Sequence, residues 1–480
     1  MESIRAHLST GLSNVTTLTS PKQVAGICGY GRGDYIGENR GPYVSLQQLQ
    51  TDYNNTGVTL TEDGQSAVCH FGRDFFANGG KRLYVTEPAV SVLKDNTFDA
   101  DGATRVFDMN ADFQGGGSAD ALVLSPIPGT VHIESPPGTV LDYGVDWICD
   151  WSQGLIYFAV APANDLGTTP HDITIDWREY TAAQLTTAFA VLETAPISLV
   201  GGAFFASSNG GYSLVDEIDA HCTASHTNRR TRFGFAEGYY RDRVNLIAGP
   251  GAYVTEWMGV FGNRSGWFND NLTTPSTSWK EFIDPTACIM GIASALSPQV
   301  TLHEKPMKNL NQIDEWNSTD IGLFNAAHVN YFGFDGISAF NCKDGYNIEG
   351  ATANFRYIDA ARSWIYIKDR VKIAMIANNC IGSQVSRSPM IAIEQTILNE
   401  LKLLHNEKVI ADPAELSFAY PEFKPVMSEL IEAFKSIIQE RSPEEWAYIQ
   451  ARQADRTEPI YVFYDYQGAL HYIDLYLGGL

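Results

Sequence analysis

Residues 355–379 read FRYIDAARSWIYIKDRVKIAMIANN, and the organisation of the chain can be worked out from this stretch. Its apolar and small residues recur at steps of three and four, which places them on one side of an α-helix. That inward side consists of Ala361, Trp364, Ile367, Val371, Ala374, Met375 and Asn378. The charged residues that are expected to project elsewhere are Arg362, Asp369, Arg370 and Lys372. The stretch therefore predicts a long amphipathic helix.

A second helix is predicted after the polar linker 380–388. Ser388 can cap its free backbone N–H groups, and Pro389 fits the first helical position because its missing N–H costs nothing there. The apolar face of this helix holds Ile393, Ile397, Leu398, Leu401 and Leu404. Two amphipathic helices joined by a short polar link usually pack against each other or on a sheet, so we expect an ordinary core pair.

The composition is that of a globular protein with more than one core. The chain has 480 residues, of which 44% are hydrophobic and 19% charged. Because single cores seldom grow past ~250 to 300 residues, we expect about two to four domains. The sequence has no run of about 18 apolar residues, and its start lacks the residue order of a signal peptide. We therefore expect a protein made in a cytoplasm, without membrane insertion.

Acidic residues dominate the charge. Asp plus Glu number 56 against 33 Lys plus Arg, which gives a formal net charge of -23. A charge of this sign opposes binding to phosphate backbones and to anionic membranes. We do not expect a nucleic-acid partner.

Seven cysteines are spread along the chain: Cys28, Cys69, Cys149, Cys222, Cys288, Cys342 and Cys380. Their spacing is too wide for a C-x-x-C metal pattern, so zinc is not expected. Free cysteine is among the most buried residue types, which favours buried thiols for most of them. An odd count excludes full pairing within one chain. If the protein lies on the outside of a particle, disulfides between chains are a further hypothesis.

The first 95 residues alternate strand and helix after a polar start. Residues 1–20 are rich in Ser and Thr and have no helical face, which is typical of an extended arm. Strands are predicted at VAGICGYG (24–31) and KRLYVTEPAV (81–90), and short helices lie between them at 45–53 and 66–80.

From about Asn96 the pattern changes to short alternating segments separated by Gly, Pro and Asn. This pattern predicts a small antiparallel β domain that ends near Tyr180. A helix at 181–195 and the buried-type strand PISLVGGAFFAS (196–207) then resume the earlier pattern. We therefore predict an α/β (α+β) core domain, assembled from separated parts of the chain, with the β domain inserted at 96–180.

The second half predicts further helices and a β-rich end. Residues 213–228 predict a helix, and Asp284 and Pro285 begin another at 284–298, as cap and first helical residue. Residues 303–313 and 324–348 are expected to be strand and loop. A third and a fourth C-terminal helix are predicted within 424–459, and 460–477 predicts two strands whose apolar residues need cover.

Two residue sets invite an enzymatic interpretation. The first is Gly29, Gly31 and Gly33, which suggest a dinucleotide-binding G-x-G-x-x-G loop. In a loop that begins with Gly29 and Gly31, the third glycine of the motif would fall at Asp34, so the spacing does not match and a plain turn is favoured. His221 and His226, with Cys222 between them, are five residues apart and lack the spacing of HExxH. The sequence also has no G-x-S-x-G elbow and no P-loop.

Taken in order, several motifs resemble the contractile tail sheath protein of bacteriophages and related injection machines. They are VAGICGYGRGDYIGENRGPYVSLQQL, FGRDFFANGGKRLYVTEP, ISLVGGAFF, PTACIMGIASALSP and the stretch 355–379 with its following helix. Each motif alone is loose, and their order around a β insertion is the more specific signal. The resemblance covers nearly the whole length.

The resemblance implies a division into an arm at 1–20, core parts at 21–95 and 181–354, the outward-facing β domain, a helical part at 355–459 and a second arm at 460–480. The arms would pair as strands with a sheet of neighbouring copies. Arm residues expected at these contacts are Leu12, Val15, Leu18, Ile460, Val462, Tyr464, Tyr472, Ile473, Leu475 and Leu477.

The same resemblance implies a structural protein without catalytic residues or cofactors. Copies would stack as hexameric rings into a helix around an inner tail tube protein, with baseplate and tail terminator proteins as further partners. The array would contract and drive the tube through the host envelope, and it would be found in the virion tail after assembly in the host cytoplasm. Disulfides between copies would lock one array or hold the arms. An acidic tube face would suit Arg362, Lys368, Arg370 and Lys372, although a solvated face suits them equally.

Two alternatives from other classes stay open at this point. One is an enzyme on an α/β core, with its site at the glycines or the histidines. The other is a surface-exposed binding protein, for which N-x-S/T sequons occur at Asn14, Asn263, Asn271 and Asn317.

Overall fold

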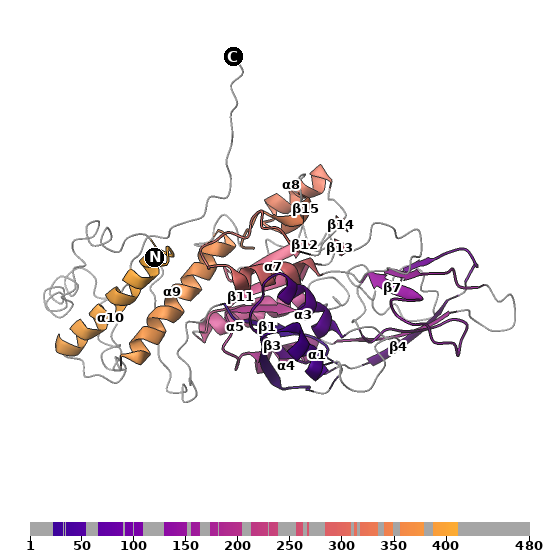
Figure 1. Cartoon of the computed structure of the whole chain (residues 1–480), viewed down its shortest axis with the longest axis horizontal. Helices are drawn as coiled ribbons and strands as arrows, with labels where there is room; N and C mark the ends of the chain where they lie inside the picture. The colour runs from indigo at the N-terminus through magenta and orange to yellow at the C-terminus, as the bar shows by residue number, and fades with distance from the viewer. Residues whose placement is uncertain are drawn as a thin grey trace, which may run out of the picture. The chain divides into compact units, whose positions relative to one another are not determined.

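A computed structural model shows a mixed α/β protein (Figure 1). It describes residues 23–31, 33, 35–53, 66–89, 92–98, 100–108, 129–150, 155–163, 173–180, 182–203, 213–228, 230–238, 256–262, 266–267, 284–308, 312–313, 317–334, 340–348, 356–378 and 387–410. The chain divides into two compact units, and the boundary between them falls in one long helix, between Ala361 and Arg362. The arm at 1–20, the helices predicted within 424–459 and the strands predicted at 460–477 lie outside the described residues.

An eight-stranded sheet forms the centre of the unit that contains residues 23–361, with the strand order β16-β15-β12-β11-β10-β1-β3-β2. Its members are β1 (Ala25–Cys28), β2 (Asn39–Tyr43), β3 (Leu83–Thr86), β10 (Leu199–Gly202), β11 (Phe233–Gly238), β12 (Met258–Gly262), β15 (Asn330–Phe334) and β16 (Phe340–Lys343). The inner strands are parallel, and the edge strands β2 and β16 run antiparallel to their neighbours. Strands from 25–86 and 199–343 thus share one sheet, which confirms that the core is α/β.

Helices cover both faces of this sheet, as a parallel sheet requires. α5 (Ser213–Thr227) lies on the same face as α4 (Ala182–Leu192), and α7 (Pro285–Ala295) lies on the other. A Cβ added at Gly234 would lie 2.5 Å from Ile218 of α5, and one added at Gly201 would lie 3.0 Å from Met290 of α7. Gly234 pairs with Val200, the residue before Gly201, so the two glycines face opposite sides and let both helix layers approach closely.

The helices α1 (Leu46–Tyr53) and α3 (Ala67–Ala77) precede β3, and α3 packs on α7. Gly291 of α7 lies against the backbone of Phe75, too close for any larger residue. Asp284 caps α7 as predicted, because its Oδ1 accepts a hydrogen bond from the Thr286 N–H at 2.8 Å. The Asp284 N–H in turn donates to Oδ2 of Asp74 at 2.8 Å, which ties the two helices together.

The residues between β3 and α4 form two three-stranded antiparallel sheets, and no described strand of either joins the large sheet. One sheet has the order β4-β9-β6 and the other β5-β8-β7. Their bounds are β4 (Val92–Phe98), β5 (Val106–Asp108), β6 (His132–Glu134), β7 (Trp147–Asp150), β8 (Leu155–Phe158) and β9 (Ile173–Glu179). The boundary predicted at 96 falls inside β4, and an inserted domain at 96–180 stays a prediction. A further pair joins β13 (Gly266–Trp267) to β14 (Gln312–Ile313).

One short helix, α8 (Ser318–Ala326), was not predicted. Its signal is in the sequence, because Asn317 caps it by accepting a hydrogen bond from the Asp320 N–H at 2.9 Å. Its nine residues expose most of their side chains and carry no long apolar face, so periodicity could not identify it.

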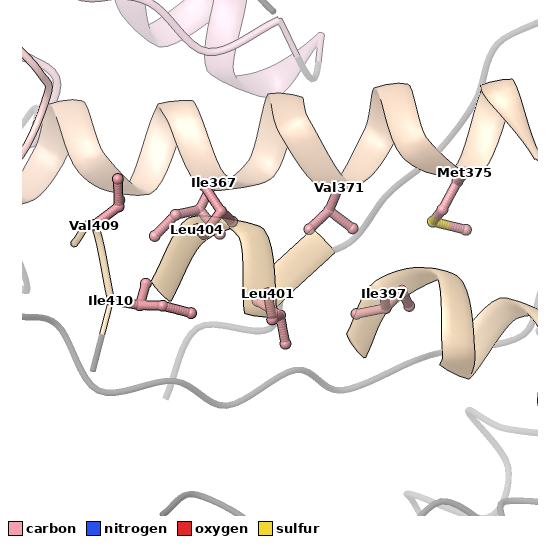
Figure 2. Packing of buried hydrophobic residues seen from close by; sticks show 8 residues of the cluster. All are labelled: Ile367, Val371, Met375, Ile397, Leu401, Leu404, Val409 and Ile410. Carbon is pink, nitrogen blue, oxygen red and sulfur yellow. The ribbon is translucent and has the colours of Figure 1, made fainter. Parts of the chain in front are cut away.

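The two long helices predicted first are α9 (Ile358–Ala377) and α10 (Arg387–Asn406), and α10 begins one residue before the predicted cap Ser388. From Arg362 onward the two helices pack through one apolar cluster (Figure 2). The cluster consists of Ile367, Val371, Met375, Ile397, Leu401, Leu404, Val409 and Ile410.

The predicted faces need three corrections. Arg362 is buried at 2% exposure and does not project outward, whereas Ala374 is half-buried and Asn378 is exposed. Residues 361–365 are all buried, so α9 is covered around its whole circumference near its start. A helical period identifies an inner face only where another face is exposed.

Candidate functional site

The glycines after β1 form a loop around one carboxylate. β1 and β3 are parallel neighbours, so the residues that follow them meet at the same edge of the sheet. Glu87, the residue after β3, is 1% exposed. Its Oε1 accepts hydrogen bonds from the N–H groups of Gly31, at 2.7 Å, and Gly33, and its Oε2 accepts one from the Tyr35 N–H at 3.2 Å.

This arrangement argues against a dinucleotide-binding role for the loop. In a dinucleotide-binding loop, backbone N–H groups bind the phosphates. Here the N–H groups of Gly31, Gly33 and Tyr35 are bonded to Glu87, and a second anion at the same place would be repelled by that carboxylate. The loop is a turn, as the sequence favoured, and a buried carboxylate holds it.

The first histidine of the candidate pair, His221, is also hydrogen-bonded within the core. His221 lies on α5, and Arg232, just before β11, places its Nη1 2.8 Å from Nε2 of His221. Since a guanidinium only donates, Nε2 accepts this bond. Burial and the Arg232 charge lower the pKa of His221 to about 3, so the ring is neutral.

Arg232 also binds the end of α4. Its guanidinium donates to the carbonyl oxygens of Leu192 at 3.1 Å, Glu193 at 2.8 Å and Ala195 at 2.9 Å. The last carbonyls of a helix have no partners within the helix, and a cation there also suits the helix dipole. Arg232 therefore joins α4, α5 and β11, and His221 is part of that junction.

His226 and Cys222 do not complete a site. The His226 ring stacks on Trp257 with centroids 4.7 Å apart, and its Nδ1 lies 3.3 Å from Oγ1 of Thr231. Burial, helped by the Asp219 charge, raises the pKa of the Cys222 thiol, which opposes a nucleophilic role. In the described part of the chain, no group of three His, Cys, Asp or Glu residues is placed to hold a metal ion.

Six of the seven cysteines lie in described residues, where they are free and buried: Cys28, Cys69, Cys149, Cys222, Cys288 and Cys342. Burial raises the pKa of the Cys28 and Cys288 thiols well above their usual range. Cys380 lies outside the described residues. A disulfide between copies stays a prediction, and any of the six would have to become exposed before forming one.

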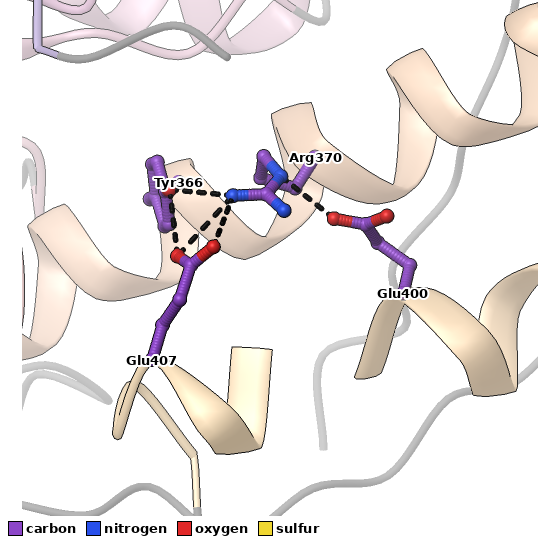
Figure 3. A network of polar contacts seen from close by, with 4 residues as sticks. All are labelled: Tyr366, Arg370, Glu400 and Glu407. Atoms are coloured by element: carbon purple, nitrogen blue, oxygen red, sulfur yellow. Dashed lines mark hydrogen bonds and ion pairs between the residues drawn. The ribbon is translucent and has the colours of Figure 1, made fainter. Parts of the chain in front are cut away.

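Two of the basic residues that the sequence offered for an acidic tube face, Arg370 and Lys368, have partners within the chain. The Nε of Arg370 lies 2.6 Å from Oε1 of Glu400, and its Nη1 lies 3.0 Å from Oε1 of Glu407 and 2.7 Å from Tyr366 Oη (Figure 3). The Tyr366 hydroxyl donates to Oε2 of Glu407 at 3.0 Å. Lys368 is buried, with its Nζ 5.1 Å from the centroid of the Trp364 ring. Arg370 therefore already has its carboxylates, which weakens its assignment to an acidic partner surface.

The ten arm residues, from Leu12 to Leu477, lie outside the described residues, so their pairing role stays a prediction. Within the part of the chain that is described, no helix is both long and apolar enough to span a bilayer.

The chain is similar to tail sheath proteins. The sheath complex, named PVC, of an extracellular contractile injection system in the contracted state shares 12% identity at a TM-score of 0.49, with 86% of this chain and 85% of that chain covered. A sheath tail protein from Listeria innocua shares 11% at 0.47, over 80% and 85%. The contracted helical sheath of the anti-feeding prophage shares 11% at 0.48, over 85% of both chains. No protein-family model and no curated protein matches the sequence. At these identities and TM-scores, the function has to be argued from the residues of this chain.

The sequence did not identify the two residues that organise these places, Glu87 and Arg232. A signal was present for Glu87, because a single acidic residue directly follows the apolar strand LYVT and a glycine-rich turn follows the other predicted strand. Arg232 precedes the apolar strand FGFA but has no comparable local mark.

Proposed function

We propose that this chain is the structural subunit of a contractile tail sheath. The observation that carries the proposal is the place of four of the five motifs that resemble sheath proteins. The motif at 24–49 supplies β1, the one at 71–88 supplies β3 and most of α3, and ISLVGGAFF supplies β10. β1 lies between β3 and β10, and α3 packs on α7, the helix of the fourth motif. Motifs that are far apart in sequence therefore make one connected core.

A second support is that both places considered for an enzymatic site have structural partners within the chain. Its two candidate places were the glycine loop and the histidine pair. The loop is bonded to Glu87, and His221 is bonded to Arg232, so both places contribute to holding the core together. The proposed role is accordingly structural, without catalytic residues or a cofactor.

A module of this kind must keep its own fold while its outer surfaces exchange partners. Long-range polar bonds suit that demand: the Lys308 N–H donates to Oδ1 of Asn78 at 2.7 Å, and the Ser294 hydroxyl donates to the Gln23 carbonyl at 3.0 Å. They join segments separated by 230 and 271 residues, so they tie distant parts of the core to each other.

In the proposed mechanism, copies assemble as stacked rings around an inner tube in a long, kinetically trapped state and then shift to a shorter, wider array. A surplus of a few kcal/mol per copy needs only an extra ~100 to 200 Å² of apolar burial, at ~25 cal/mol per Å². The strands proposed at 1–20 and 460–480 keep neighbours joined by pairing with their sheets. Baseplate and tail terminator proteins would lie at the two ends of this array in the virion tail.

Negative-stain electron microscopy of the purified chain tests the proposal. Long cylinders or stacked rings are expected. A variant that lacks 1–20, or one that lacks 460–480, should remain folded by circular dichroism and form no ordered cylinders. Compact particles of the full chain that bind a nucleotide or a metal ion would instead favour the enzyme alternative.

A further inference from the structure

Asn330, at the start of β15, fixes a short segment before α9. Its Nδ2 donates to the carbonyl oxygens of Val260 at 3.2 Å and Tyr346 at 2.9 Å. Its Oδ1 accepts from the N–H groups of Gly345 at 2.8 Å and Tyr346 at 2.7 Å. These bonds use the full capacity of the amide, and Asn330 is completely buried. The backbone at 345–346 is therefore held in one position.

The residues that lead into α9 are bonded to this segment. The Asn347 N–H donates to the Arg356 carbonyl at 3.0 Å, and the Ile358 N–H donates to the Gly345 carbonyl at 2.9 Å. The Tyr346 and Tyr357 rings stack with centroids 5.5 Å apart and planes inclined by 20°. The two tyrosines form a rigid aromatic surface, which we call the tyrosine platform.

The Arg356 side chain lies on the tyrosine platform. Its Cζ is 5.6 Å from the Tyr346 ring centroid and 5.5 Å from that of Tyr357, distances at which a guanidinium is attracted to a ring face. Arg356 is exposed, although Tyr346 beneath it is buried. Among the described residues, no carboxylate forms an ion pair with Arg356, in contrast to Arg370 with Glu400 and Glu407.

We propose that Arg356, held on the tyrosine platform, docks a carboxylate of a second copy of this chain. The inference rests on the proposed function and names one contact of that assembly. Copies with a formal net charge of -23 repel each other, and a contact that pairs a carboxylate with one of the scarcer cations offsets part of this repulsion. Arg and Tyr are enriched where few residues supply most of the binding energy. Because the platform already restricts the guanidinium, little conformational entropy is lost on docking.

The test compares the concentration at which cylinders first form, measured by pelleting and confirmed by negative stain. Arg356→Ala should raise this concentration about tenfold or more, because a hydrogen-bonded ion pair is lost at each contact. Arg356→Glu should abolish the cylinders, since it opposes two carboxylates. The matched control is Arg82→Ala, at an exposed arginine for which no ring stacking is found among the described residues, and it should leave the concentration unchanged.

Thermal unfolding by circular dichroism separates docking from folding. The melting temperature of Arg356→Ala should stay within a few degrees of the parent value, because an exposed cation–π contact contributes little to the stability of the fold. If the parent chain forms cylinders and Arg356→Ala forms them at the same concentration, the docking role is overturned while the sheath function stands. If the parent chain forms no cylinders under any condition, both the docking role of Arg356 and the proposed sheath function are overturned.

Discussion

At the scale of single residues, Glu87 holds the glycine loop after β1 through hydrogen bonds to its N–H groups. Replacing it by Ala leaves the buried N–H group of Gly31 and the partly buried N–H group of Gly33 without this acceptor, at about 1 to 3 kcal/mol for a fully buried group. We expect Glu87→Ala to lower the free energy of unfolding by about 3 kcal/mol in urea titrations. Glu38→Ala, at a carboxylate with a side chain 59% exposed near the same loop, should change it by less than about 0.5 kcal/mol. Equal stabilities of the two variants would contradict the role given to Glu87.

His221 gives a pH dependence with a defined sign. Its pKa is about 3 in the folded chain, because of burial and then Arg232, against about 6.5 when unfolded. Between these values the unfolded chain binds the extra proton, so stability falls as the pH drops from about 6.5 toward 3, by at most about 1.4 kcal/mol per unit. His221→Gln should flatten this slope in urea titrations between pH 6.5 and 4.5. Part of the slope should remain in this variant, because burial also lowers the pKa of His70. An unchanged slope in His221→Gln would refute the assignment.

The sequence identified the glycines and His221 as unusual, but it could not identify what they bind. Glu87 is 56 residues from Gly31, and Arg232 is 11 residues from His221, across a helix end and a strand start. Such partners are selected by which strands become neighbours in the sheet, and no local pattern encodes that choice.

At the scale of elements, local rules succeeded where a periodic face or a cap was present. β1, α3, β10 and α7 lie where apolar runs, Gly79 and the Asp284 cap placed them. The rules failed at α8, which has no apolar face, and at Arg362, where α9 is buried all round. In both places tertiary packing, which a single sequence does not display, outweighs the local signal.

The apolar cluster between α9 and α10 can be tested with two leucines of the same helix. Leu401 belongs to the cluster (Figure 2) and is 4% exposed. Leu403, two residues further along α10, is 49% exposed. Leu401→Ala should cost about 2 to 5 kcal/mol, from lost burial plus a cavity, and Leu403→Ala about 0.5 kcal/mol or less. Urea unfolding followed by circular dichroism measures both. Similar losses for the two variants would show that the helices do not pack through this cluster.

At the scale of the whole molecule, two compact units make a single free energy of unfolding a poor description of the chain. Glu87 belongs to the unit that contains residues 23–361, and Leu401 belongs to the unit that contains the residues after Ala361 on α9 and all of α10. Each substitution is therefore expected to shift the transition of its own unit first. If the proposed sheath role is correct, assembly binds the folded units and stabilises both by mass action.

The cysteines allow one last prediction at this scale. Six thiols are buried, and burial raises the pKa of several of them, so a link between folded copies is expected to involve Cys380, the seventh. Assembled particles run on gels without reductant are expected to show covalent dimers that disappear in Cys380→Ser and persist in Cys342→Ser. The buried thiols should react with a water-soluble thiol reagent only after urea is added, because the thiolate, which is the reacting form, is scarce at a buried site. Dimers that persist in Cys380→Ser would show that a buried cysteine becomes exposed during assembly, and with it part of the core described here.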